Sequence, residues 1–362
     1  MFSPSDYIHM AHALRLAERG LYSTSPNPRV GCVLVHNNQT VASGWHEKAG
    51  CPHAEIIALN QAGQGARHAT AYITLEPCSH YGRTPPCANA LIEAGIARVV
   101  MAMQDPNPLV SGCGRAMLEQ AGIKVQAGLL HDEAQALNRG FVSRMTRRRP
   151  WVRLKIASSL DGRIALNNGA SQWITGNAAR LDGHRWRARS CAIMTGIGTV
   201  KADNPQLTVR DLDVVRQPTK IVVDSKLDIS CDARLLQEGN TVIFTANLEK
   251  SDKKAVLEER GVRIFVEPNE NAKVDVHKMF SRLADLEMNE VLVEAGGELG
   301  GVLVEAGLVD ELIFYFSPQL LGDCAQPMLR LPELTELHNS KKLTIKDVRM
   351  IGKDFRILTG FQ

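Results

Sequence analysis

The chain has 362 residues, a hydrophobic fraction of 44% and a formal net charge of +3. This length is long for one domain and suits two, and so small a net charge argues against a nucleic-acid partner. The eight cysteines lack the spacing of a disulfide framework, and no apolar run approaches the roughly 18 residues of a membrane span. We therefore expect a cytoplasmic protein with no membrane partner.

The first half of the chain is predicted to alternate helices and strands. Its first helix is expected to be capped by Ser5 or Asp6. The expected helices cover residues 6–20, 53–61, 87–94 and 112–121, and the expected strands cover 30–35, 40–44, 71–75, 99–103 and 125–127. Both metal-binding segments described next then fall at helix N-termini, where the helix dipole favours thiolate over thiol.

Two short motifs in this half indicate a zinc-dependent hydrolytic site. The sequence HAE occupies residues 53–55, and PCSHYGRTPPC occupies residues 77–87. His53, Cys78 and Cys87 offer three zinc ligands and leave one coordination position open, as in catalytic sites. Glu55 is then the proton carrier, as in nucleobase deaminases, although those usually have two residues between the cysteines and this chain has a longer loop.

A structural zinc site is the main alternative to this interpretation. Such a site takes four protein ligands, and Cys51 and His80 are near enough in sequence to supply the fourth. A structural site, however, gives Glu55 no role.

A second domain is predicted after the basic run Arg147-Arg148-Arg149, which we interpret as a solvated link. We place the first domain at residues 1–147 and the second at residues 148–362. Strands are expected over residues 151–157, 192–196, 221–224, 241–245, 263–266 and 290–295. Apolar strands separated by helical segments predict an α/β domain with a largely parallel sheet.

A glycine-rich segment follows the last of these strands. GGELGG occupies residues 296–301, and a helix is expected over 302–306. A strand, a glycine loop and a helix can present backbone N–H groups to a phosphate, but the same glycines can form a plain turn. The segment matches neither the Rossmann fingerprint nor the Walker A loop.

Over its full length the chain resembles the bifunctional riboflavin-biosynthesis deaminase/reductases of bacteria. Besides the zinc motifs, the resemblance rests on NPRVG at 27–31, DPNP at 105–108, GCG at 112–114, KIASSLDGR at 155–163, SQWIT at 171–175, GIGTV at 196–200, DNPQLTVR at 203–210 and EAGG at 294–297. The long loop between the cysteines, unusual for deaminases in general, is a feature of this family.

The resemblance implies two reactions and two folds. A cytidine-deaminase-like domain would use one Zn²⁺ per chain to deaminate 2,5-diamino-6-ribosylamino-4(3H)-pyrimidinone 5′-phosphate. A dihydrofolate-reductase-like domain would then use NADPH to reduce the ribosyl chain, giving 5-amino-6-ribitylamino-uracil 5′-phosphate. The implied partners are small phosphorylated pyrimidines and other copies of the chain in a homo-oligomer.

The resemblance also implies roles for individual residues. In the deaminase, the residues implied to contact the substrate are Asn27, His80, Arg83, Asp105 and Asn107. In the reductase, those implied to contact NADP are Ala157, Trp173, Thr199, Asp203, Gly296, Gly297, Glu298, Leu299, Gly300, Gly301 and Val302. Those implied to contact its substrate are Ser171, Arg187, Leu207, Arg210 and Glu294, with Lys155 and Glu294 as the polar groups nearest the chemistry. A lysine on a strand is also a common structural ion-pair partner.

Three other functions remain to be weighed. A tRNA or nucleoside deaminase would share the zinc motif but requires a basic groove and leaves the second half unexplained. A zinc-stabilised binding module would tolerate replacement of Glu55. A chain with one inactive half would show degraded motifs, and none is visible here.

Overall fold

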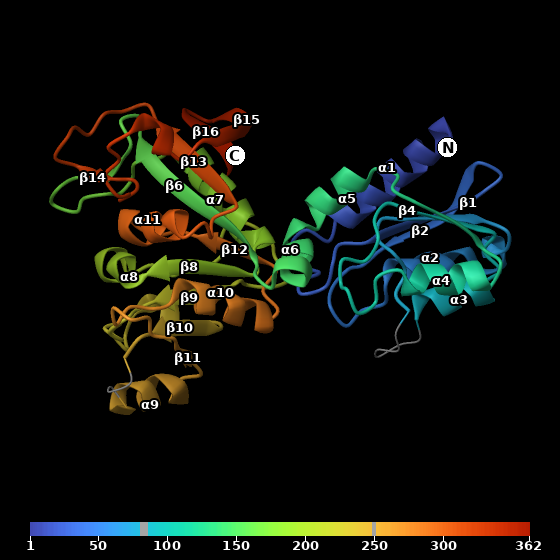
Figure 1. The fold of residues 1–362 in the computed structure, drawn as a ribbon, viewed down its shortest axis with the longest axis horizontal. Helices are drawn as coiled ribbons and strands as arrows, with labels where there is room; N and C mark the ends of the chain where they lie inside the picture. Colours follow the sequence, from blue (N-terminus) through green and yellow to red (C-terminus); the bar gives the residue numbers. More distant parts are fainter. Residues whose placement is uncertain (80–85, 248–250) are drawn as a thin grey trace. The chain divides into compact units, whose positions relative to one another are not determined.

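The computed structural model describes residues 1–79, 86–247 and 251–362, which form two compact units, Met1–Arg149 and Pro150–Gln362 (Figure 1). Within these described ranges, no helix is both long and apolar enough to cross a membrane.

The first unit is built on a five-stranded sheet in the order β2-β1-β3-β4-β5. Its strands are β1 (Gly31–His36), β2 (Gln39–Trp45), β3 (Thr70–Ile73), β4 (Arg98–Met101) and β5 (Lys124–Ala127). β1 is antiparallel to β2 and β3, whereas β3, β4 and β5 are parallel. The helices are α1 (Pro4–Glu18), α2 (Ala54–Ala62), α3 (Cys87–Glu93), α4 (Cys113–Gln120), α5 (His131–Leu137) and α6 (Arg139–Arg147).

These helices cover both faces of the sheet. In Figure 1, α1 and α5 lie on one face, and α2, α3 and α4 lie on the other. α1 packs directly on β1, because a Cβ atom at Gly31 would lie 2.0 Å from the carbonyl oxygen of Ala13. The core between the layers is apolar and includes residues from β1, β3 and β4.

The first helix begins earlier than expected. Its N-cap is Ser3, whose hydroxyl accepts from the backbone of Asp6 at 3.2 Å while the Asp6 carboxylate accepts from the backbone of Ser3 at 2.7 Å. The prediction of Ser5 or Asp6 as the cap was therefore wrong. Asp6 is the third helical residue and completes a capping box, and Pro4 suits the first helical position because that position needs no N–H donor.

The second unit contains a nine-stranded sheet in the order β11-β10-β9-β8-β12-β6-β13-β16-β15. Its strands are β6 (Trp151–Ser159), β8 (Ala192–Gly196), β9 (Thr219–Val223), β10 (Thr241–Thr245), β11 (Arg263–Val266), β12 (Glu290–Val293), β13 (Glu311–Ser317), β15 (Leu343–Ile351) and β16 (Asp354–Phe361). β7 (Arg163–Ala165) and β14 (Gln326–Pro327) form a separate pair. The strands from β11 to β13 are all parallel, as predicted, and the antiparallel hairpin β15–β16 was not predicted.

Alternate residues along the parallel strands face two different helical layers. Ile221 of β9 packs with residues of α10 (Val276–Asp285) and α11 (Gly297–Glu305). The next residue, Val222, packs instead with residues of α8 (Ile197–Asp203) and α9 (Ser251–Glu259). Leu292 of β12 faces α7 (Asn177–Arg189). Helices therefore cover both faces of the sheet, which explains why both alternating sets of positions along its central parallel strands are largely apolar.

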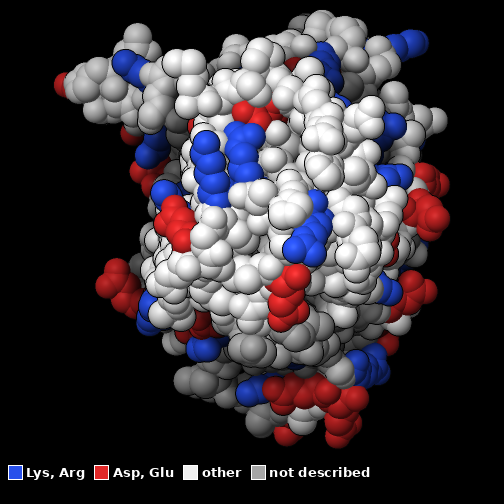
Figure 2. Space-filling model, turned by 90° about the vertical axis from the view of Figure 1, so that its right-hand side faces the viewer, with Lys and Arg blue, Asp and Glu red and all other residues white. Residues whose placement is uncertain are grey.

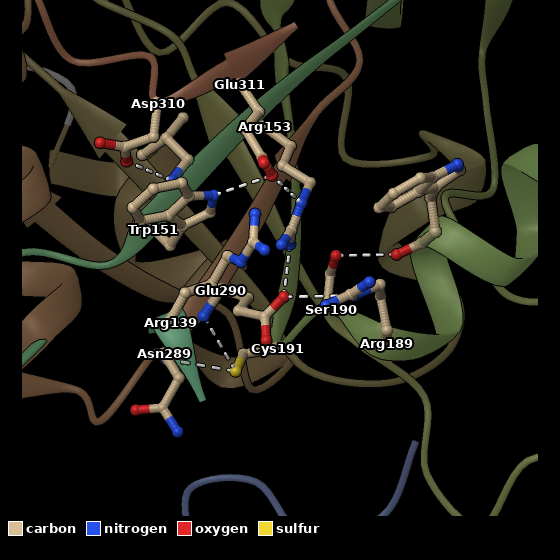
Figure 3. A network of polar contacts seen from close by, with 12 residues as sticks. Arg139, Trp151, Arg153, Arg189, Ser190, Cys191, Asn289, Glu290, Asp310 and Glu311 are labelled. Carbon is tan, nitrogen blue, oxygen red and sulfur yellow. Dashed lines mark hydrogen bonds and ion pairs between the residues drawn. The ribbon is translucent and has the colours of Figure 1, made fainter. Parts of the chain in front are cut away.

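A network of charges is buried in this sheet (Figure 3). Arg153 of β6 contacts Glu290 of β12, and its Nε lies 2.8 Å from a carboxylate oxygen of Glu311 on β13. All three side chains are 1% exposed. Trp151 donates its indole N–H to Glu311 at 3.0 Å. Each buried charge thus has an opposite charge and a hydrogen bond, as buried ions require.

Candidate active sites

The residues predicted to bind zinc come from three segments of the first unit. His53 is the N-cap of α2, Cys87 is the first residue of α3, and Cys78 lies in the segment that follows β3. Their donor atoms all lie within 4.8 Å of one another. The fold thus gathers a histidine and two cysteines that are distant in sequence.

The donor atoms have the spacing of a tetrahedral metal site. The Nδ1 atom of His53 lies 3.2 Å from Sγ of Cys87 and 3.6 Å from Sγ of Cys78. Zinc–sulfur and zinc–nitrogen bonds of about 2.3 and 2.0 Å at a tetrahedral angle place N and S about 3.5 Å apart. The three residues therefore fit a zinc ion with one position left open. Among the described residues, Cys51 is not part of this group, and His80 lies outside them.

The two thiols differ in their electrostatic environment. The backbone N–H at the start of α3, from Cys87, donates to Sγ of Cys78 at 3.3 Å. The hydrogen bond from the Cys87 thiol, followed by that from His53, lowers the pKa of Cys78 to about 4. The bond to Cys78 and burial instead raise the pKa of Cys87. The N-terminus of α3 therefore favours the thiolate of Cys78 directly, and a bound cation would favour ionisation of Cys87.

Glu55 lies in the first turn of α2 and is 3% exposed. Burial is the main cause that raises the pKa of its carboxyl group to about 7. The thiol of Cys87 is within hydrogen-bonding reach of this carboxyl group. A carboxyl group with a pKa near neutrality beside three metal donors is suited to accept and return a proton.

Asn27 is positioned by a histidine that has no sequence motif. The Nδ2 atom of Asn27 lies 3.0 Å from Nε2 of His46, and Nδ1 of His46 lies 3.1 Å from the carbonyl oxygen of Pro52. A carbonyl group only accepts, so the His46 proton is on Nδ1 and Nε2 accepts from the amide. The rings of His46 and His53 meet edge to face, with centroids 5.3 Å apart. His46 therefore links Asn27 to the predicted zinc ligands.

The segment that carries Asn27 is fastened by Arg29. Its backbone N–H donates to Oδ1 of Asn138 at 2.8 Å, and Asn138 returns a bond to the Arg29 carbonyl at 2.9 Å. The Arg29 guanidinium donates to the carbonyl of Leu137, the last residue of α5, at 2.7 Å. These contacts explain the arginine of the NPRVG motif as a structural residue.

The other residues predicted to contact the deaminase substrate divide into two groups. Asp105 and Asn107 lie in one partly buried loop, where the Asp105 carboxylate accepts from the backbone of Asn107 at 2.8 Å. His80 and Arg83 lie outside the described residues.

In the second unit, the predicted site residues gather at the carboxyl ends of neighbouring parallel strands. Ala157 lies near the end of β6, Gly196 ends β8, and Glu294 follows β12. β12 lies between β6 and β8 in the sheet. The carboxyl ends of strands in open α/β sheets are the usual place for a ligand.

Glu294 is the centre of a charged cluster at this edge. Its carboxylate accepts from Nε and Nη2 of Arg187 at 2.7 and 2.9 Å. Burial would raise the pKa of Glu294, but Arg187 and then Lys155 outweigh it and hold this pKa at about 2. Burial lowers the pKa of Lys155. Arg187, which the resemblance implies is a substrate contact, is 15% exposed and pairs with Glu294.

Helix α7 also fastens the loop that contains Leu207 and Arg210. Arg187 donates to the carbonyl of Thr208 at 2.9 Å, and the backbone N–H of Arg210 donates to Nδ1 of His184 at 3.1 Å. Leu207 is buried, whereas Arg210 is exposed. His184 was not predicted, because an isolated histidine on a helix belongs to no motif.

The remaining residues predicted at the cofactor site lie on loops and on α8. Ser171 hydrogen-bonds to Asp203, the last residue of α8, so a predicted substrate residue and a predicted NADP residue are neighbours. Thr199 lies on the same helix. Trp173 is 67% exposed, and the guanidinium of Arg180 lies 4.4 Å from its ring centroid.

The glycine-rich segment is mostly helix. α11 begins at Gly297, five residues before the helix predicted to start at Val302. A Cβ atom at Gly301 would lie 1.9 Å from the carbonyl oxygen of Arg330, and one at Gly297 would lie 2.8 Å from that of Pro327. At Gly296, the N-cap, a Cβ atom would meet open space. The helical glycines therefore serve packing, and only the start of the segment is free to approach a phosphate.

Comparisons with known proteins match both units. Residues 4–103 match the family model of the cytidine and deoxycytidylate deaminase zinc-binding region, and residues 150–357 match the model of the RibD C-terminal domain. The riboflavin biosynthesis protein RibD of Escherichia coli (strain K12) is 46% identical over 361 residues, covering 96% of this chain and 97% of that protein. The RibD of Aquifex aeolicus (strain VF5) is 38% identical over 361 residues, covering 99% of each.

Solved structures give the same match over the whole chain. Form 1 of the RibD of Acinetobacter baumannii has a TM-score of 0.92 at 42% identity, covering 99% of each chain. A diaminohydroxyphosphoribosylaminopyrimidine deaminase/5-amino-6-(5-phosphoribosylamino)uracil reductase from Thermotoga maritima has a TM-score of 0.88 at 32% identity, also covering 99% of each chain.

Proposed function

We propose residue roles for a chain that belongs to the RibD family, the bifunctional deaminase/reductases of riboflavin biosynthesis. It catalyses two consecutive steps of that pathway. The first is hydrolytic deamination of 2,5-diamino-6-ribosylamino-4(3H)-pyrimidinone 5′-phosphate. The second is reduction of the ribosyl chain to ribityl, giving 5-amino-6-ribitylamino-uracil 5′-phosphate. We assign the first step to residues 1–147 and the second to residues 148–362, and we place the enzyme in the cytoplasm.

In the deaminase, His53, Cys78 and Cys87 hold one zinc ion. The observation that carries this role is the cluster of three donor atoms within 4.8 Å of one another, with the buried Glu55 beside it. When bound, zinc polarises a water molecule and lowers its pKa toward neutrality. Glu55 accepts the two protons of the attacking water one after the other, and delivers the first to the ring nitrogen and the second to the departing amino group, which leaves as ammonia. The hydrogen bond to His46 fixes the orientation of the Asn27 amide, so the rest of that amide group keeps a constant direction in the site.

The substrate contacts of the deaminase are proposed for Asn27, Asp105, Asn107, His80 and Arg83. Amide and carboxylate groups suit the polar edge of a pyrimidine. A guanidinium group at Arg83 suits the 5′-phosphate, because it binds phosphate oxygens bidentately.

In the reductase, NADPH supplies the hydride that is transferred to the sugar carbon. The uncapped N-terminus of α11 and the open space at Gly296 suit its diphosphate. Ala157, Trp173, Thr199 and Asp203 would contact the rest of the cofactor. Of the segment 297–302, we propose contact chiefly through the first turn of α11, because Gly300 and Gly301 pack against Leu329 and Arg330.

The reductase substrate would meet Lys155, Ser171, Arg187, Leu207, Arg210 and Glu294. The Arg187–Glu294 pair fixes the carboxylate and leaves it ionised. A fixed carboxylate is a hydrogen-bond acceptor for sugar hydroxyl groups. Arg210, which is exposed and does not pair with Glu294, is the better phosphate ligand of the two arginines.

The charge distribution on one face of the molecule fits a small-molecule substrate better than a nucleic acid. On the face shown in Figure 2, Lys and Arg side chains are interspersed with Asp and Glu side chains. A nucleic-acid deaminase would need a basic stripe to neutralise phosphates.

Replacement of Glu55 tests the deaminase assignment. The change Glu55→Gln keeps the side chain's shape but removes the proton acceptor, so we expect ammonia release to fall by a factor of about 100 or more. Zinc content, and NADPH oxidation with already deaminated substrate, should remain at the wild-type level. The exposed Glu47→Gln is the matched control. Wild-type ammonia release from Glu55→Gln would contradict the assignment.

A further inference from the structure

Glu76 is a buried carboxylate beside the zinc site that the proposed chemistry does not use. It lies two residues before Cys78 and is 4% exposed. Its Oε2 atom accepts from the backbone N–H groups of Asp105 and Gly112 at 3.1 and 3.0 Å. Its Oε1 atom accepts from the backbone N–H of Arg115 at 3.0 Å. Both oxygens are therefore engaged by main-chain donors.

These donors lie at the two ends of one loop. Asp105 is at the start of the loop, Gly112 is the residue that caps α4, and Arg115 is in the first turn of that helix. Within the loop, Asp105 accepts from the backbone of Asn107, and Asn107 accepts from that of Leu109 at 3.1 Å. Those bonds fix the loop's local shape, whereas the bonds to Glu76 fix its place relative to the segment that carries Cys78.

Main-chain packing joins the same two segments. A Cβ atom at Gly114 would lie 2.0 Å from the carbonyl oxygen of Pro77, so α4 approaches the chain between Glu76 and Cys78 without any side chain in between. The backbone N–H of Glu76 also donates to the carbonyl of Met103 at 2.9 Å. This close approach explains the last glycine of the GCG motif, to which the reaction itself assigns no role.

We propose that Glu76 is a positioning residue of the deaminase site. Its carboxylate holds Asp105 and Asn107 at a fixed place relative to Cys78, so that the pyrimidine meets its polar contacts and the metal together. The charge suits this role, because a carboxylate binds N–H groups strongly and is favoured at a helix N-terminus. The inference rests on the proposed function in one respect, that Asp105 and Asn107 contact the substrate.

Glu76→Gln tests this role, because one oxygen becomes an amide nitrogen that cannot accept from a backbone N–H. We expect the KM for the diaminopyrimidinone substrate to rise about tenfold or more, with kcat changed far less, as for a loss of substrate binding. Zinc content per chain, and NADPH oxidation with deaminated substrate, should stay at the wild-type level. Glu93→Gln, an exposed glutamate on α3, removes the same charge and should leave KM unchanged.

A second variant separates positioning from support of the metal. Gly114→Ala pushes α4 away from Pro77 and crowds Glu76, because the added Cβ atom would lie 3.3 Å from Cγ of Glu76, but it keeps both carboxylate oxygens as acceptors. It should therefore reproduce the rise in KM even if Glu76→Gln fails to fold. An unchanged KM in both variants would overturn the inference. So would loss of zinc with a fall in kcat at constant KM, because Glu76 would then only support the metal ligands. Absence of ammonia release from the wild type would instead refute the deaminase function itself.

Discussion

His184 has a side chain whose ring nitrogen must stay unprotonated in the folded reductase unit. Nδ1 accepts from the backbone of Arg210, and the ring is 8% exposed. Burial, followed by the charges of Arg187 and Arg210, lowers the pKa of His184 to about 4, and Glu294 and Asp211 oppose this only in part. The folded state therefore disfavours the protonated ring.

This predicts a pH dependence of stability. Because folding lowers the pKa of His184, its contribution to the free energy of unfolding is fully present above the ordinary histidine pKa near 6.5. This contribution is lost progressively as the pH falls from 6.5 toward 4. Each pH unit in that window is worth about 1.4 kcal/mol. We expect the stability of His184→Gln to fall less steeply than wild type over this window, as measured by thermal melting. The exposed His277→Gln should follow wild type, and parallel curves for all three proteins would refute the account.

Arg153 lies between two buried carboxylates and is the fully buried cation that contacts both (Figure 3). Each carboxylate also has a second, more exposed partner, Arg189 for Glu290 and Lys346 for Glu311. Arg153→Met leaves Glu290 and Glu311 in the sheet interior without this partner, which we expect to cost about 3–5 kcal/mol. Arg349→Met, which breaks an ion pair whose arginine is 65% exposed, should cost less than about 1 kcal/mol. Urea unfolding followed by circular dichroism measures both, and equal costs would contradict the assigned role of Arg153.

Some site residues could be predicted from the sequence, and others could not. His53, Cys78, Cys87 and Glu55 were identified because their spacing matches a known chemistry. His46, Glu76 and His184 were missed because each acts through contacts with residues distant in sequence, which no local pattern encodes. The signal that could have found Glu76 is a charged residue three positions after a buried strand, directly before the Pro-Cys of the zinc motif.

At the scale of elements, the glycines of α11 and its N-cap have two different roles, which are close packing and access for a ligand. Gly301 touches the backbone of Arg330, whereas Gly296 faces open space. We expect Gly301→Ala to lower unfolding free energy by about 1–3 kcal/mol through overpacking. Gly296→Ala should fold normally, because its φ of −68° suits alanine, and should weaken NADPH binding. Thermal melting measures the stability of both variants, and titration with NADPH measures their cofactor binding. If Gly296→Ala alone were destabilised, the roles assigned to the two glycines would be reversed.

The same helix shows why element boundaries were missed. Glycine disfavours helix, so residues 297–301 were predicted as a loop. Packing of these glycines against residues 327–330 outweighs that preference. The strand β13 and the hairpin β15–β16 were not predicted. β15 is an edge strand without a fully buried residue. Its apolar alternation, Leu343 and Ile345 followed by Val348 and Met350, is interrupted where the register shifts between Ile345 and Asp347, which weakens the pattern that marks a half-buried strand.

At the scale of the whole molecule, the sequence predicted two α/β domains and a largely parallel second sheet. Both follow from periodicity, because buried parallel strands are apolar throughout and helices separate them. The identity of each reaction came from motif resemblance instead. Spacing alone left the glycine segment undecided between a phosphate loop and a turn, and the structure divides that segment between a free N-cap and a packed helix.

The central claim is that one chain holds two sites, of which only the first depends on zinc. Removing zinc with a chelator and restoring it tests this claim most directly. We expect the metal-free protein to release no ammonia from the diaminopyrimidinone substrate, yet to oxidise NADPH with deaminated substrate at the wild-type rate. One equivalent of Zn²⁺ per chain should restore ammonia release. Ammonia release that persists without zinc, or NADPH oxidation that disappears with it, would contradict the account.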